Sequence, residues 1–117
     1  MPGSEQMTDA ERSVKIRKLN DTFRRSLRGG RLIITQGVFT KAQEEITDLL
    51  DAVRRFEDFD EGNDPYREHD FGSLVWREEQ VFWKIDYYDT DLRFASPDPL
   101  DPHVTVRVMT VMLAWEY

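Results

Sequence analysis

The sequence predicts an α+β fold with the element order α-β-α-β-β-(β)-α, in which an antiparallel sheet of three to four strands packs against helices. Two stretches in the first half of the chain carry apolar residues at helical spacing, and two later stretches alternate apolar and polar residues. The chain has 117 residues, of which 39% are hydrophobic, and this suffices for one core. We expect a disordered leader at residues 1–7 and a single domain over residues 8–117.

The first helix is expected to run from Thr8 to Arg28. Thr8 and Glu11 have the spacing of a capping box, and Gly29 with Gly30 supplies the left-handed conformation of a C-cap. One face of the helix is apolar and holds Ile16, Leu19, Phe23 and Leu27. The rest of its surface is basic and holds Arg17, Lys18, Arg24, Arg25 and Arg28.

A short strand and a second helix are expected next. Residues 31–36 are apolar and β-branched, which is typical of a strand, and a turn should follow it. Thr40 is expected to cap the second helix, with Gln43 at the capping-box position. Asp51 is expected to pair with Arg55 one turn later. The predicted buried stripe consists of Ile46, Leu49, Leu50, Val53 and Phe56.

Two strands are predicted at residues 71–77 and 81–88, and the short link between them indicates a β-hairpin. Side chains of the second strand alternate between two faces. One face holds Val81, Trp83, Ile85 and Tyr87, and the other holds Phe82, Lys84, Asp86 and Tyr88. Residues 92–95 are expected to add a short further strand.

The C-terminal stretch, residues 103–115, is open to two interpretations. Its β-branched residues favour a strand. Five apolar residues nevertheless fall on one helical face, namely Val104, Val108, Val111, Met112 and Trp115. Asp101 followed by Pro102 is also a favourable helix start. We therefore expect a helix here, with a strand as the alternative.

Residues 57–70, here called the acidic loop, contain seven carboxylates among fourteen residues. Such a loop is either a solvated surface or a binding surface for a basic protein, with aromatic residues as anchors. The residues expected to bind a partner are Asp58, Phe59, Asp60, Glu61, Asp64, Tyr66 and Glu68. We expect the partner to be a protein, such as a nucleic-acid-binding complex whose basic channel the acidic row would occupy.

A second interpretation is chemical. His69 lies between Glu68 and Asp70, and a histidine beside carboxylates can serve as a general base or a metal ligand. Neighbouring side chains of an extended chain point in opposite directions, so hydrogen bonds that tie the loop to the strands are the simpler interpretation. Lys84 and Asp86 share a strand face, as lysine and carboxylates do in metal-dependent nucleases. The alternative is therefore a small metal-dependent hydrolase or nuclease that uses His69, Asp70, Lys84 and Asp86.

The charge is unevenly distributed. Residues 1–31 carry eight basic and four acidic residues, whereas residues 32–117 carry eight basic and nineteen acidic residues. Because the sequence pI is about 4.8, direct contact with nucleic acid is less expected than contact with a protein. The chain has no cysteine, which excludes disulfides and thiolate metal sites and indicates the cytoplasm. It also has no apolar run of the length that a membrane helix requires.

Several motifs occur together: NDPYREHDFG at residues 63–72, FWKIDYYD at residues 82–89 and SPDP at residues 96–99. With the patterns at residues 16–24 and 112–117, they resemble a small bacterial family that is labelled only as a domain of unknown function. The resemblance covers nearly the whole chain and implies no activity, cofactor or catalytic residue. Members of that family are frequent on plasmids and mobile elements, which implies an accessory role in the contest between such elements and their host.

These observations together predict a non-enzymatic interaction protein of a mobile genetic element. Its acidic surface would bind and inhibit a host nucleic-acid-handling defence complex, in the manner of an anti-CRISPR or anti-restriction protein. Under this hypothesis no residue is catalytic, and no cofactor or metal is required. A further alternative is a homodimer whose interface contains exposed aromatic residues such as Phe82 and Tyr88.

Overall fold

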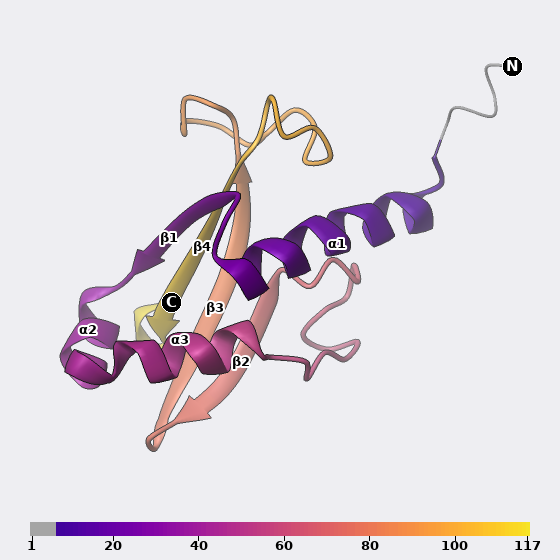
Figure 1. Cartoon of the computed structure of the whole chain (residues 1–117). Helices are drawn as coiled ribbons and strands as arrows, with labels where there is room; N and C mark the ends of the chain where they lie inside the picture. Colours follow the sequence, from indigo (N-terminus) through magenta and orange to yellow (C-terminus); the bar gives the residue numbers. More distant parts are fainter. Residues whose placement is uncertain (1–6) are drawn as a thin grey trace, which may run out of the picture.

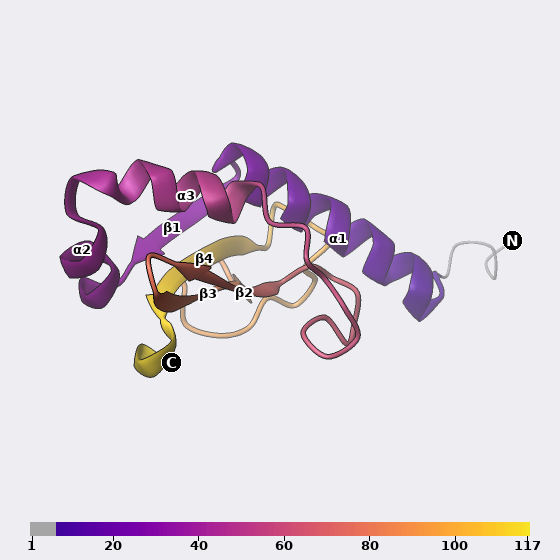
Figure 2. The same cartoon turned by 90° about the horizontal axis from the view of Figure 1, so that it is seen from below.

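The structure, a computed structural model, describes residues 7–117 and has helices on one face of a four-stranded sheet (Figures 1 and 2). The helices are α1 (Asp9–Ser26), α2 (Gln36–Ala42) and α3 (Ile46–Arg54), with single 3-10 turns η2 (Gln43–Glu45) and η3 (Ala114–Glu116). The strands are β1 (Gly30–Ile34), β2 (Phe71–Trp76), β3 (Glu79–Tyr88) and β4 (Val106–Leu113). The expected disordered leader falls, except for Met7, outside the described residues.

The sheet has the strand order β1-β4-β3-β2. The β2–β3 and β3–β4 pairs are antiparallel, whereas β1 runs parallel to β4. The α+β class is therefore confirmed, but the sheet is mixed rather than purely antiparallel. Residues far apart in the sequence meet at its centre, because the first strand pairs with the last.

The predicted helix at residues 103–115 is wrong, since this stretch contains β4. β4 lies between β1 and β3, so both of its edges are paired. Side chains on both of its faces are largely buried, and apolar residues therefore fill successive positions. Such a continuous apolar run also places several residues on one helical face, which explains the error. Asp101 accepts a hydrogen bond from the backbone of His103 at 2.9 Å and thus stabilises a turn instead of starting a helix.

The expected second helix is divided in two. α2 begins before Thr40, because Thr35 is its N-cap, and Gln43 with φ 50° separates α2 from α3. The Thr35 hydroxyl also donates to Glu116 Oε1 at 2.6 Å, and Gly37 N donates to Glu116 Oε2 at 3.0 Å. Burial alone would raise the pKa of Glu116, but the hydrogen bonds that its carboxylate accepts lower it below its usual value. Contacts with Glu116, in the C-terminal turn η3, therefore stabilise the start of α2.

Two smaller expectations also change. Residues 92–95 form no strand of their own, and only an isolated bridge joins Ala95 to Tyr88. Asp51 pairs with Arg54 at 3.3 Å and not with the Arg55 guanidinium. The capping box of Thr8 and the predicted stripe of α3 are confirmed, because Leu49, Val53 and Phe56 are buried.

The core lies between the helices and one face of the sheet, around Trp83, which has no exposed surface. Within residues 7–117, no α-helix covers the other face of the sheet (Figure 2). On that face Phe71, Phe82 and Tyr117 form an aromatic cluster, with the rings of Phe71 and Phe82 5.2 Å apart. The side chains that alternate along β3 therefore have the two faces that the sequence predicts. Whether Phe82 and Tyr88 belong to a subunit interface is a prediction that stays open.

Candidate functional site

The acidic loop joins α3 to β2 and lies beside the first half of α1 (Figures 1 and 2). Hydrogen bonds within the loop order its backbone. Asp60 Oδ1 accepts from the backbone of Gly62 at 2.8 Å and of Asn63 at 2.9 Å, and Asn63 Nδ2 donates to the Asp58 carbonyl at 2.9 Å. The tip of the loop is thus a defined turn, stabilised by its own polar side chains.

His69 connects the end of the loop to α1. Its Nδ1 lies 2.9 Å from Asp21 Oδ1, and its Nε2 lies 3.5 Å from Asp64 Oδ2. The backbone N–H of His69 also donates to Asp64 Oδ1 at 3.0 Å. The imidazole stacks on Phe59 with ring centroids 3.6 Å apart. Both ring nitrogens of His69 therefore face carboxylates of this chain, those of Asp21 and Asp64, and these contacts hold the loop against α1.

Arg24 lies beneath this contact and has no exposed surface. It donates from Nη1 to the carbonyls of Val53 and Arg54, and so stabilises the C-terminal end of α3. Its Nη2 lies 3.1 Å from Asp21 Oδ1, and its guanidinium lies 5.1 Å from the centroid of the Trp83 ring. Burial lowers the pKa of Arg24, and the hydrogen bond and charge of Asp21 oppose this shift.

Asn20 holds a second set of contacts one turn earlier on α1. Its Nδ2 donates to the Glu68 carbonyl at 3.0 Å and to the Tyr87 hydroxyl at 2.7 Å, while its Oδ1 accepts from Arg107 Nε at 2.8 Å. The Tyr87 hydroxyl donates to Glu68 Oε1 at 2.8 Å. Burial raises the pKa of Tyr87, so the phenol stays protonated and remains a donor.

We call these residues the buried anchor: Asn20, Asp21, Arg24, His69, Tyr87 and Arg107. The anchor joins α1, α3, β3 and β4 to the acidic loop. The sequence interpretation missed Asn20, Asp21 and Arg107, and it assigned Arg24 to an exposed basic stripe. A signal existed, since Asn20 and Arg24 follow Ile16 at intervals of four and so fall on the apolar face of the helix.

The residues predicted to bind a partner divide into two groups. Asp58, Asp60 and Glu61 are exposed, as is Tyr66, 72% of whose surface is accessible. Three others point inward, namely Phe59, Asp64 and Glu68, and of these Asp64 is only 5% exposed. The inward group stabilises the loop through His69 and Tyr87, so the accessible acidic surface is smaller than the sequence suggests.

The four residues of the hydrolase alternative do not converge. By extension of the β2–β3 register, Asp70 lies opposite Ile85 on the helix-covered face. Lys84 and Asp86 lie on the other face and pair with each other at 3.0 Å. Burial, with the nearby charge of Glu68, raises the pKa of Asp70 to about 6. Within residues 7–117, no group of three or more histidine, aspartate or glutamate residues is arranged to hold a metal ion.

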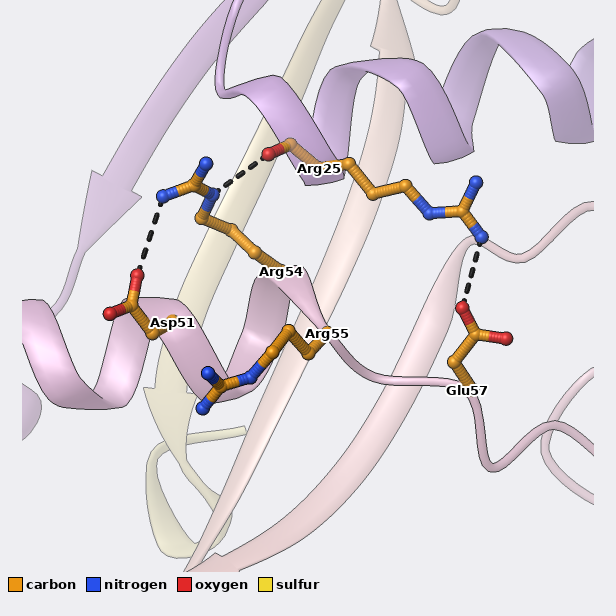
Figure 3. Close-up of a pocket in the computed structure, with 5 residues that line it drawn as sticks. All are labelled: Arg25, Asp51, Arg54, Arg55 and Glu57. Carbon is orange, nitrogen blue, oxygen red and sulfur yellow. Dashed lines mark hydrogen bonds and ion pairs between the residues drawn. The ribbon is translucent and has the colours of Figure 1, made fainter.

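A separate hollow lies on the surface between the ends of α1 and α3, and it combines three arginines with two carboxylates (Figure 3). Arg25 Nη2 lies 3.1 Å from Glu57, and Arg54 Nη1 lies 3.3 Å from Asp51. Arg54 also donates from Nε to the Arg25 carbonyl at 2.8 Å. These pairs are exposed, and the hollow adjoins the C-terminal ends of two helices, which disfavour anions.

Comparison with known proteins gives a family but no activity. Residues 34–116 match the family model described as "Protein of unknown function (DUF3768)". No curated protein and no solved structure matches the chain. The resemblance to a family without an assigned function is thus confirmed over this span, which contains α2, α3 and the three strands β2, β3 and β4. Between residues 7 and 117, no helix has the length and apolar character needed to span a membrane.

Proposed function

We propose that this chain, which belongs to the DUF3768 family, is a non-enzymatic interaction protein whose acidic loop binds a basic protein surface. In its specific form, the proposal is that the protein acts in the cytoplasm for a mobile genetic element and inhibits a host defence complex of the CRISPR or restriction type. The partner surface would be one that otherwise contacts nucleic acid.

The observation that carries the proposal is the way the acidic loop is held. Its exposed carboxylates, Asp58, Asp60 and Glu61, project from a backbone that internal hydrogen bonds and the buried anchor fix in place. A loop that is ordered before binding loses less conformational entropy when a partner docks.

The charge of the loop and an exposed aromatic residue also support binding to a basic protein surface. The loop presents the exposed carboxylates of Asp58, Asp60 and Glu61, whose negative charge would accelerate association with a basic surface. Tyr66 adds a large exposed aromatic side chain beside the carboxylates. Tyrosine is common among the residues that contribute most to the affinity of protein interfaces. The hydrolase alternative has no comparable observation in its favour, because His69 contacts α1 and Asp70 lies on the face of the sheet opposite Lys84 and Asp86.

A charge-reversal experiment tests the proposal. The double variant Asp58→Lys/Glu61→Lys changes only exposed side chains, while Asp64 is left intact because it stabilises the loop. The matched control Glu44→Lys/Asp91→Lys changes the net charge equally, at exposed positions outside the loop. Both are assayed in cells with a restriction system or a CRISPR system, challenged with an unmodified or targeted plasmid.

The wild-type chain and the control should raise plasmid establishment in one of the two defended hosts, whereas the loop variant should not. Establishment should be unchanged in a host without defence systems. If the wild-type chain has no effect in either defended host, inhibition of these defences is wrong. If the loop variant is as active as the control, the inhibition does not depend on the acidic loop.

A further inference from the structure

β1 is an edge strand with one open side. Among the strands of residues 7–117 it pairs with β4 alone, and Figure 1 shows no helix or strand beyond its outer edge. Thr35, just after β1, donates its backbone N–H to the Val111 carbonyl at 3.1 Å. Alternate residues of a strand direct their backbone groups to opposite edges, so Arg31 and Ile33 also face β4. The backbone groups of Gly30, Leu32 and Ile34 therefore point outward.

Nothing in β1 blocks addition of another strand. Within residues 7–117, no backbone group accepts from or donates to these outward groups. The strand has the sequence GRLII, without the proline or bulge that commonly protects an edge, and Arg31 is its one charged residue. Its outer-face side chain Ile33 is 49% exposed.

We propose that a second copy of this chain pairs with this edge, β1 against β1 in antiparallel orientation about a two-fold axis, so that the two sheets become one. This goes beyond the proposed function, and it uses a different surface from the acidic loop. A two-fold antiparallel pair centred on Leu32 sets Leu32 opposite itself and Gly30 opposite Ile34 of the second copy. These are the residues whose donors and acceptors point outward, so the register pairs every one of them.

The charges are compatible with a second copy at β1. In the register centred on Leu32, Arg31 lies opposite Ile33 of the second copy, so no like charges meet within the strands. β2 has charges of both signs at its ends, with Arg67, Glu68 and Asp70 before it and Arg77, Glu78 and Glu79 after it. An antiparallel β2–β2 pair would bring these groups together in like-charge as well as opposite-charge pairs, so charge gives β2 no advantage over β1.

The register makes a sharp test available at Ile33. Ile33→Lys and Ile33→Glu remove the same exposed apolar side chain, but lysine would face Arg31 of the second copy and glutamate would form an opposite-charge pair with it. Sedimentation velocity of the full chain at micromolar concentration should give twice the monomer mass of 13.9 kDa for the wild type and for Ile33→Glu. The lysine variant should dissociate more readily than the glutamate variant, by about tenfold in dissociation constant.

Two further measurements complete the test. The double variant Arg31→Glu/Ile33→Lys reverses both partners and should restore the dimer, while Val75→Lys on the β2 edge should leave it unchanged. Circular dichroism confirms that each variant is folded. A wild-type chain that is monomeric at every concentration would overturn the proposal, as would equal dissociation constants for Ile33→Lys and Ile33→Glu. A dimer that only Val75→Lys disrupts would assign the interface to β2 instead.

Discussion

Arg24 and Arg25 are neighbours on α1, yet they belong to two different regions. Arg24 is part of the buried anchor and has no exposed surface. Arg25 lines the open hollow between α1 and α3, where its side chain is 54% exposed and pairs with Glu57 (Figure 3). Both arginines make an ion pair of the same length, 3.1 Å. Burial, not distance, distinguishes them.

The difference shows which ion pairs stabilise this fold. Exposed ion pairs add little to the free energy of unfolding, because water and salt screen the charges and both side chains lose conformational freedom. In the buried anchor, removal of one partner leaves the others without the hydrogen bonds that compensate for lost hydration. The anchor also determines where the acidic loop lies, whereas the hollow fixes no other segment by a buried contact. Three measurements can sharpen or break this comparison.

The largest effect is expected for Arg24→Ala. This change removes the hydrogen bonds to the carbonyls of Val53 and Arg54 and the ion pair with Asp21, so we expect a loss of about 3 kcal/mol in the free energy of unfolding. Urea denaturation measures it. Arg24→Met restores most of the volume without the charge, and so separates the loss of packing from the loss of the ion pair. A loss below about 1 kcal/mol for Arg24→Ala would contradict the role of the anchor.

A smaller, pH-dependent effect is expected for Asp70, whose carboxylate lies at the junction of the acidic loop and β2. Burial, with the charge of Glu68, raises the pKa of Asp70 to about 6 from 3.8. The folded state therefore holds this proton more tightly than the unfolded chain does. The resulting stabilisation is fully present below pH 4 or so and is lost as the pH rises through about 6.

Asp70→Asn stays uncharged at every pH, so it should be more stable than the wild type at about pH 8 and equally stable at about pH 3. We expect a difference of about 1 kcal/mol at the higher pH, because partial exposure screens the charge. Thermal or urea unfolding at the two pH values measures the difference. Asp58→Asn, at an exposed position of the same loop, is the control and should show no such pH dependence. An advantage of Asp70→Asn that is independent of pH would point to a cause other than ionisation.

The smallest effect is expected for Arg25→Ala. Its pair with Glu57 is exposed on both sides, so the free energy of unfolding should change by about 0.5 kcal/mol or less, and by less still at high salt. The same urea titration compares it directly with Arg24→Ala. If the two neighbouring variants lose equal stability, burial is not what distinguishes the two regions.

The sequence predicted the elements whose signal is local. The capping box of Thr8, the stripe of α3 and the two faces of β3 are each visible within a few residues, and all are found in the structure. The sequence-based prediction was wrong where contacts with a distant segment determine the structure. The start of α2 depends on Glu116, which accepts hydrogen bonds from Thr35 and Gly37 about 80 residues away in the chain.

The candidate site follows the same pattern. The acidic loop and His69 are visible in the sequence as a run of carboxylates around a histidine. The sequence does not show that the loop is ordered. Its order comes from contacts between segments that are distant in the sequence, such as Asn20 with Tyr87 and Asp21 with His69. Polar residues on an apolar helical face were the only local signal of these contacts.

By itself, then, the sequence determined the α+β class, the first helix and the buried stripe of α3, the central hairpin and the acidic character of the loop, because these depend on periodicity and composition within short windows. Only the tertiary structure decided that residues 106–113 form a strand, that β1 runs parallel to it and that Arg24 is buried. Each of these features depends on which distant segments pack against one another. A β-branched apolar segment becomes a strand when strands flank it on both sides, and the buried Arg24 is stable because carbonyls of another helix complete the contacts that Asp21 provides in its own helix.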